Sequence, residues 1–95
     1  MSSLEEVRAE IQRIDRNIVD LIKKRTELSE KVLESKRKSG LPINDEAQNK
    51  VVLERAVDNA IEFNLDTNPV RSIFKILIEM SIEHQQELSG KGKFP

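Results

Sequence analysis

Residues 3–39 read SLEEVRAEIQRIDRNIVDLIKKRTELSEKVLESKRKS. The apolar residues of this stretch recur in alternating steps of three and four, which is the heptad-like pattern of a long amphipathic helix. They are Leu4, Val7, Ile11, Ile14, Ile18, Leu21, Leu28 and Val32. Ser2 or Ser3 is a suitable N-cap, and Gly40 ends the helix. At about 1.5 Å per residue the helix is roughly 50 Å long, so part of its apolar seam needs a second chain.

A shorter helix is expected over residues 45–63. Asp45 is its N-cap, and Gln48, three residues on, is the capping-box partner. Its apolar face consists of Val51, Leu53, Ala56, Val57, Ala60 and Ile61. The segment 64–66 breaks the helical pattern.

A third helix starts at Asn68-Pro69, with Asn68 as the N-cap and proline at the first helical position. It ends near Ser89, and its apolar stripe is Val70, Ile73, Phe74, Leu77 and Ile78. No segment shows the alternation typical of strands, so the sequence predicts an all-α fold with one long and two shorter helices. The predicted domain covers residues 1–89, followed by a flexible tail at 90–95.

The composition argues against several classes of protein. The 95 residues suffice for one small domain, whose modest core favours oligomerisation. The 16 basic and 17 acidic residues give a net charge of −1, and Trp and Tyr are absent, which disfavours a nucleic-acid or anionic-membrane partner. Without cysteine there is no disulfide, thiolate metal site or cysteine nucleophile. No stretch resembles a signal peptide or a membrane span, so a cytoplasmic location is expected.

Arg25 interrupts the seam of the long helix, where the pattern predicts an apolar residue. A buried guanidinium needs an anion or several acceptors, because an unpaired buried charge is costly. Lys36 lies about three turns and ~16 Å further along the same face, with Ser29 between them. The gap between the two cations suits a small dianion. Spacing alone favours a structural role instead, with Arg25 paired to an acidic residue of another helix and Lys36 solvated near the helix end.

Other polar residues also occupy notable positions. Ser81 and Gln85 continue the stripe of the third helix, four residues apart on one face. Spacing leaves open whether they serve a site, satisfy each other or reach solvent. Arg8 lies about 25 Å from Arg25 along the helix, so the two could share a site only across an antiparallel dimer, and by spacing alone Arg8 is an exposed arginine. His84 has no second ligand at metal spacing, which favours a surface histidine and no metal site.

These residues belong to an ordered set that resembles the all-helical AroQ class of chorismate mutases over about residues 4–88. The set comprises Arg8-x2-Ile11-x3-Asp15, Leu21-Ile22-x2-Arg25-x2-Leu28, Lys36, Gly40-x-Pro42-Ile43-x-Asp45, Leu53-Glu54-Arg55 and Phe74-x3-Ile78-Glu79-x-Ser81-x3-Gln85. No single piece is decisive, but the ordered set is specific and needs no insertion or deletion.

The resemblance implies an intertwined six-helix homodimer that rearranges chorismate to prephenate, in phenylalanine and tyrosine biosynthesis, without a metal or cofactor. It implies that Arg25, Lys36 and Ser81 hold the substrate carboxylates. Lys36 and Gln85 would hydrogen-bond the ether oxygen, and Arg8 would come from the partner subunit. The reaction is intramolecular and needs no nucleophile or obligatory proton transfer, so fixed cations and a hydrogen-bond donor on rigid helices suffice for it.

Gln48 and Asn49 depart from the family pattern. After the loop aspartate, here Asp45, the family usually carries Arg and Glu at these two positions. The resemblance implies that Asp45 lies at the edge of the site, near the substrate ring, and that the glutamate contacts the ring hydroxyl. Asn49 can still hydrogen-bond a hydroxyl, and Gln48 is neutral. The paired change is close to charge-neutral, so we expect a working but weaker mutase in which both residues bind substrate.

Two other functions remain open at the level of sequence. Related helical enzymes cleave isochorismate to salicylate and pyruvate, share the Arg, Lys and Gln set, and can lack that glutamate. The run Ile43-Asn44-Asp45 favours the mutase. A non-catalytic helical dimerisation module would instead pair Arg25, Ser81 and Gln85 among themselves, and chorismate would then fail to raise its melting temperature.

Overall fold

The computed structural model describes residues 3–90, and this part of the chain is all-helical. It has three helices, α1 (Leu4–Ser39), α2 (Glu46–Glu62) and α3 (Thr67–Leu88), and no strand within the described range. The prediction of one long and two shorter helices is therefore confirmed. Ser2 and the predicted tail 90–95, apart from Gly90, lie outside the described residues.

The ends of α1 are satisfied by the residues that flank it. Ser3 Oγ accepts a hydrogen bond from the Glu6 backbone N–H at 3.1 Å, as expected of an N-cap. At the other end Gly40 adopts a φ of 69°, a left-handed conformation that costs glycine little. The N–H of Leu41 then donates to the Lys36 carbonyl at 3.0 Å. This closure leaves Lys36 in the last turn of the helix.

The turn between α2 and α3 passes through Asn64, whose φ of 57° lies in the left-handed region that asparagine tolerates. Asp66 then caps α3 by accepting a hydrogen bond from the Asn68 N–H at 3.2 Å. The prediction that Asn68 is the cap is wrong. The cap is Asp66, two residues earlier, whose carboxylate accepts from a backbone N–H of the first helical turn. Pro69 still lies in the first turn, where its missing N–H costs nothing.

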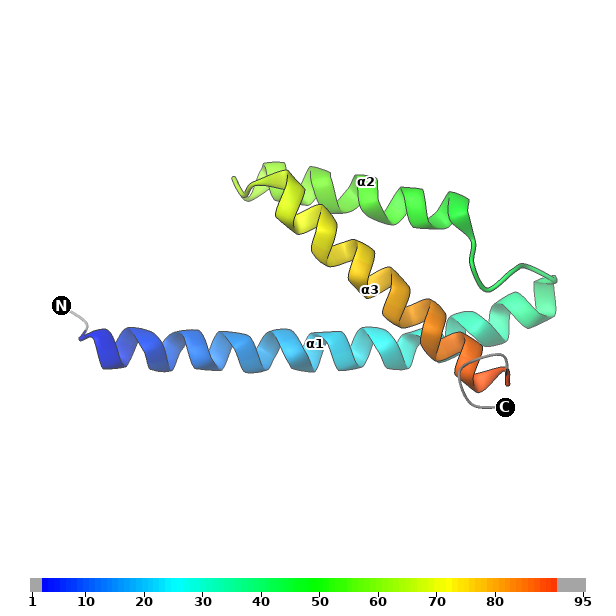
Figure 1. Cartoon of the computed structure of the whole chain (residues 1–95), viewed down its shortest axis with the longest axis horizontal. Helices are drawn as coiled ribbons and strands as arrows, with labels where there is room; N and C mark the ends of the chain where they lie inside the picture. Colours follow the sequence, from blue (N-terminus) through cyan, green and yellow to red (C-terminus); the bar gives the residue numbers. More distant parts are fainter. Residues whose placement is uncertain (1–2, 91–95) are drawn as a thin grey trace.

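The third helix joins the other two. α3 packs against both α1 and α2, whereas α1 and α2 do not pack on each other. Figure 1 shows α2 and α3 as a hairpin, with α3 crossing α1 over the C-terminal half of α1. The fold measures 56 × 28 × 20 Å, and its radius of gyration is 16.6 Å, against about 12 Å for a compact domain of this length. The protomer is therefore elongated.

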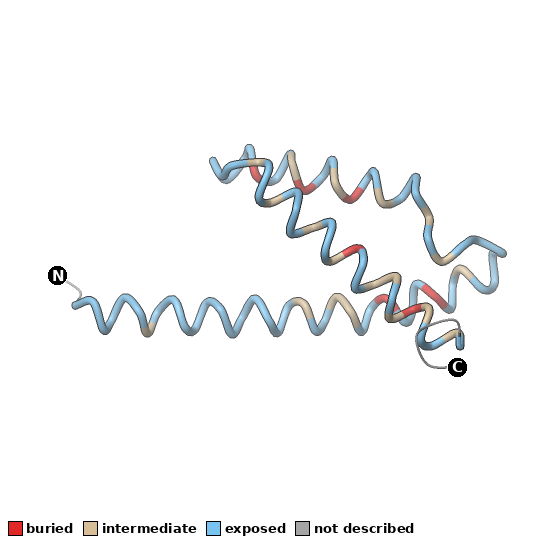
Figure 2. The backbone as a smooth tube through the Cα atoms, in the orientation of Figure 1, coloured by how far each residue is buried: buried red, intermediate tan, exposed pale blue. Residues whose placement is uncertain are grey.

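The core lies where α3 meets its neighbours (Figure 2). The buried apolar residues are Leu33, Val52, Ala56, Ala60 and Ile78. Val52, Ala56 and Ala60 recur every four residues and form one face of α2, whose small side chains let α3 approach closely. The apolar face predicted for α2 is therefore partly wrong, because Val51 and Ile61 are 49% and 63% exposed while Val52 is buried.

The apolar seam of α1 is left uncovered by the other residues that the structure describes. Its aliphatic residues from Leu4 to Val32 are each between 40% and 63% exposed. In Figure 1 the N-terminal half of α1 extends away from α2 and α3. A continuous row of exposed aliphatic side chains is typical of an interaction surface. No helix in the part of the chain that the structure describes is long and apolar enough to cross a membrane.

Candidate active site

Arg25 lies half-buried between α1 and α3. Its Nη1 donates to the Leu77 carbonyl at 3.0 Å and to Ser81 Oγ at 2.7 Å. Both acceptors are uncharged, so neither neutralises the guanidinium. Burial lowers the pKa of Arg25, and the positive charge of Arg55 lowers it further. An anion that entered this site would therefore relieve the cost of holding the cation.

Lys36 is held by two acceptors near the end of α1. Its Nζ donates to the Ile43 carbonyl and, at 3.1 Å, to Oε1 of Gln85. An ammonium has three N–H donors, so one is left for a ligand. Gln85 is only 3% exposed, and because its amide oxygen accepts from Lys36, its Nε2 hydrogens are the donors it can still offer. Burial lowers the pKa of Lys36, while the carboxylate of Asp45 acts in the opposite direction.

These groups line one cavity of about 240 Å³, formed by all three helices. Six of the predicted site residues line it: Arg25, Lys36, Gln48, Asn49, Ser81 and Gln85. The rest of its lining consists of Ser29 and the apolar residues Leu28, Val32, Ile43, Val52, Ile78 and Ile82. Among the described residues that line the cavity, the charged ones are both cations. The cavity therefore suits a small molecule that carries negative charge on an apolar frame.

A larger hollow, of about 550 Å³, lies along α2 and the start of α3. The acidic residues Glu46, Glu54 and Asp58 outnumber the cations Lys50 and Arg71 in its lining. This charge balance disfavours an anionic ligand. Size alone would favour this hollow, but the chemistry of the side chains favours the smaller cavity as the candidate active site.

Two predicted site residues, Asp45 and Arg8, do not line the cavity. Asp45 Oδ1 accepts a hydrogen bond from the Gln48 N–H at 3.2 Å and caps α2, as predicted. Because its carboxylate raises the pKa of Lys36, Asp45 lies close to the cavity's edge. Arg8 is exposed near the start of α1, about 25 Å from Arg25 along the helix axis. A single chain therefore does not bring Arg8 together with the others.

Asn49 is oriented by its neighbour in the loop before α2. Its Nδ2 donates to Oδ1 of Asn44 at 2.8 Å. This bond leaves the Asn49 side-chain oxygen as an acceptor for a ligand hydroxyl. Gln48 is exposed, so it forms the open side of the cavity.

Arg55 belongs to the ordered set of the sequence but was given no role in the site. Its charge lowers the pKa of Arg25, so it adds to the positive potential without lining the cavity. Arg55 lies seven residues after Gln48, which is about two turns along the same face of α2. That spacing was the available signal, and it became informative only once Gln48 was placed at the cavity.

The family of the chain follows from comparison with known proteins. Residues 7–86 match the model of the chorismate mutase type II family. Because the match covers most of the chain, the protein belongs to this family of isomerases, and the resemblance drawn from the sequence is confirmed. Neither the isochorismate-cleaving enzyme nor the non-catalytic module is favoured.

Individual relatives agree with this assignment. A chorismate mutase of Methanocaldococcus jannaschii is 35% identical over 97 residues, which cover 98% of each chain. A bifunctional chorismate mutase/prephenate dehydratase of Buchnera aphidicola subsp. Schizaphis graminum is 39% identical over 84 residues. The match covers 88% of this chain but only 22% of that bifunctional relative, so the likeness is to one segment of the larger protein.

Proposed function

We propose that the chain catalyses the intramolecular rearrangement of chorismate to prephenate in phenylalanine and tyrosine biosynthesis. The observation that carries the proposal is a cavity whose charged lining residues are Arg25 and Lys36, with Gln85 hydrogen-bonded to Lys36. Membership of the chorismate mutase family supports the same reaction. Chorismate is a small dianion with a ring hydroxyl and an ether oxygen, and the cavity offers a partner for each of these groups.

Binding begins with the two carboxylates of the substrate. Arg25 and Lys36 each hold a positive charge that their present acceptors do not neutralise. A dianion supplies the missing charge, and Ser81 adds a hydroxyl donor beside Arg25. The apolar walls enclose the ring and strengthen these interactions by excluding water. The bound substrate is held in the compact conformer in which the two carbons to be joined lie close together.

The chemical step breaks one C–O bond and forms one C–C bond within the same molecule. No proton is gained or lost, and no group is transferred to the protein. Negative charge develops on the ether oxygen as the C–O bond breaks. We assign the remaining N–H of Lys36 and the Nε2 hydrogens of Gln85 to that oxygen. Because these groups are already held in place, they stabilise the developing charge with little reorganisation.

The proposed active form is an intertwined six-helix homodimer. The exposed seam of α1 supports it, since two such seams would remove each other from water. The elongated shape of the protomer supports it as well. In an antiparallel arrangement the start of one α1 reaches the partner's cavity, and Arg8 then adds a third cation there. Mixing of variant subunits tests this arrangement, because it reads out a site shared by two chains.

The proposal includes the domain and its setting. The catalytic domain is assigned to residues 1–89, and the enzyme acts in the cytoplasm without a cofactor. The predicted tail at 90–95 lies, apart from Gly90, outside the residues that the structure describes. The names of the bifunctional relatives combine a chorismate mutase with a dehydratase of prephenate. This pairing supports prephenate as the product.

The direct test is to mix purified protein with chorismate and follow the loss of its ultraviolet absorbance. Acid treatment should then convert the product to phenylpyruvate. Isochorismate is run in parallel, and formation of salicylate from it would identify the lyase instead. If neither substrate reacts and chorismate leaves the melting temperature unchanged, the non-catalytic module is supported.

Asn49→Ala is expected to raise KM for chorismate about threefold to tenfold with little change in kcat, because it removes one hydrogen bond to the ring hydroxyl that both ground and transition states use. Steady-state kinetics with chorismate measure this effect. Asn44→Ala is the intermediate case, since it removes the bond that orients Asn49 but keeps the acceptor oxygen, so its KM should rise less than that of Asn49→Ala. An unchanged KM for chorismate in Asn49→Ala would show that the assigned hydroxyl contact is wrong.

The fall of activity at alkaline pH, the alkaline limb of the pH profile, is expected to follow the loss of the Lys36 proton. Only the protonated amine carries the positive charge and the third N–H for the ether oxygen, so activity is present below the Lys36 pKa and is lost as pH rises through it. Burial lowers this pKa, so kcat/KM should fall at a lower pH than an ordinary lysine with a pKa of about 10.4 would allow. Asp45→Asn removes the carboxylate that raises the pKa and should move the limb lower still.

The profile of kcat provides an internal comparison for this assignment. A bound dianion favours the charged amine, so the limb in kcat should lie at higher pH than the limb in kcat/KM. Lys36→Arg keeps its charge throughout this range and should flatten the limb. A limb that persists unchanged in Lys36→Arg would exclude Lys36 as the titrating group.

A further inference from the structure

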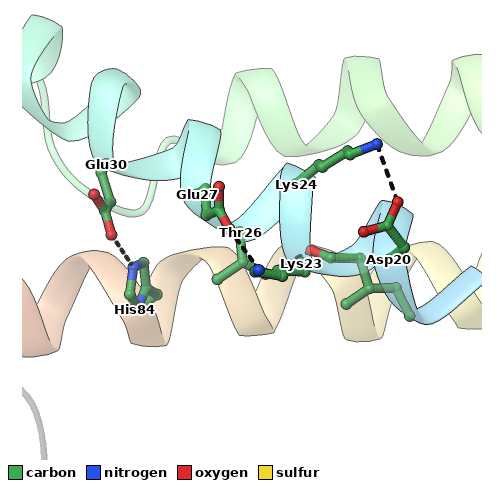
Figure 3. A network of polar contacts seen from close by, with 8 residues as sticks. Asp20, Lys23, Lys24, Thr26, Glu27, Glu30 and His84 are labelled. Atoms are coloured by element: carbon green, nitrogen blue, oxygen red, sulfur yellow. Dashed lines mark hydrogen bonds and ion pairs between the residues drawn. The ribbon is translucent and has the colours of Figure 1, made fainter.

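Glu30 of α1 and His84 of α3 form a cross-helix pair outside the cavity. Glu30 Oε1 lies 2.9 Å from His84 Nε2, and Figure 3 shows the two side chains pointing toward each other where the helices cross. The side chains are 53% and 28% exposed, respectively. The histidine predicted to be a surface residue is therefore partly buried in the helix contact. Neither residue lines the cavity.

The pair adjoins the cavity lining on both helices. His84 directly precedes Gln85, and Glu30 directly follows Ser29. Gln85 and Ser29 are 3% and 4% exposed and line the cavity. Adjacent residues of a helix point about 100° apart. The Glu30–His84 pair therefore links α1 and α3 beside the cavity, while Ser29 and Gln85 face into it. Holding His84 against Glu30 therefore fixes the rotation of the turn that carries Gln85.

Two further side-chain links between α1 and α3 involve the proposed substrate-binding groups. Arg25 reaches Ser81, and Lys36 reaches Gln85. When a dianion enters, it binds the N–H groups of both cations that these contacts leave free, so both links belong to groups that also hold the substrate. The Glu30–His84 pair lies outside the cavity and has no substrate to compete for it.

We propose that His84 and Glu30 are positioning residues whose contact keeps Gln85 in register with Lys36 while substrate is bound. This inference rests on the proposed mutase activity. Both the neutral imidazole with its proton on Nε2 and the imidazolium donate to a carboxylate. Without it, the Gln85 amide loses its fixed distance to the ether oxygen, and stabilisation of the transition state falls while substrate binding by Arg25 persists.

The test is kinetic. His84→Ala is expected to lower kcat about fivefold to tenfold while KM changes by less than about twofold, because misplacing a transition-state donor acts on kcat. Glu30→Ala should behave alike, and the double variant should be no worse than either single one, since all three lose the same link. His84→Gln, whose amide can donate to Glu30, should recover part of the rate.

Lys50→Ala is the matched control, because it removes an exposed ion pair with Glu54, at 4.0 Å, on α2. Its kcat should equal that of the wild type. A lowered melting temperature with unchanged kcat in His84→Ala and Glu30→Ala would make the pair merely structural and overturn the inference, as would double-variant losses that simply multiply. Inactive wild-type protein would overturn the proposed function and the positioning role together, whereas active wild-type protein with unaffected variants would overturn the positioning role alone.

Discussion

Arg25→Ala is expected to lower kcat/KM for chorismate by about a thousandfold or more. The guanidinium sits where burial and Arg55 already lower its pKa, so its charge is available to a substrate carboxylate and is poorly screened by water. Removing it deletes a charge-assisted contact made in both the ground and transition states. It also leaves Ser81 without the group that holds its hydroxyl. Both kcat and KM should therefore change.

Three measurements make this result interpretable. Arg25→Lys keeps the charge but loses the planar fork, and it should fall between the wild type and the alanine variant. Arg37→Ala removes another cation from the last turn of α1, away from the cavity lining, and should leave the rate unchanged. Thermal unfolding of each variant shows whether the protein is folded. A folded Arg25→Ala protein that keeps about a third or more of the wild-type kcat/KM would exclude the cavity as the active site.

The helices were predictable because their ends carry strong local signals. Ser3, Gly40 and Asp45 act through contacts within a few residues, and the structure places each at the expected helix end. The start of α3 differs from the prediction because Asp66, two residues before Asn68, supplies the cap. Residue type does not tell whether Asp66 or Asn68 caps the free N–H groups, since that depends on the conformation of the preceding turn.

Most residues that line the candidate site were predictable, but their contacts were not. A polar residue in an apolar stripe occupies a position that is expected to be buried, which marks it as a candidate for a site. Arg25, Ser81 and Gln85 were found in this way. Their mutual distances depend on how α3 crosses α1, which no single helix pattern encodes. For the same reason the sequence did not reveal the pairing of His84 with Glu30. The apolar face of α2 was predicted correctly at Ala56 and Ala60 but included Val51 instead of Val52, because the two valines are alike and only packing against α3 distinguishes them.

Mixing Arg8→Ala subunits with Arg25→Ala subunits is expected to restore activity that neither variant has alone. In the proposed dimer each site combines Arg8 of one chain with Arg25 of the other. A heterodimer of the two variants then contains one site with both arginines and one site with neither. Random reassociation gives about half heterodimers, so the mixture should recover about a quarter of wild-type activity. The measurement is chorismate turnover after joint unfolding and refolding, with dimers verified by sedimentation.

A second mixture provides the control. Arg25→Ala and Lys36→Ala both alter the residues that one chain contributes to its own cavity, so every site in their heterodimer has one defect and no activity should return. If the Arg8 mixture also stays inactive although heterodimers form, Arg8 does not act across subunits. Recovery in the first mixture alone would mean that pairing through the exposed seam of α1 is needed to complete the active site. Only a partner chain can bridge the ~25 Å that separate Arg8 from Arg25 along one helix, and pairing of the two seams is what would bring it there.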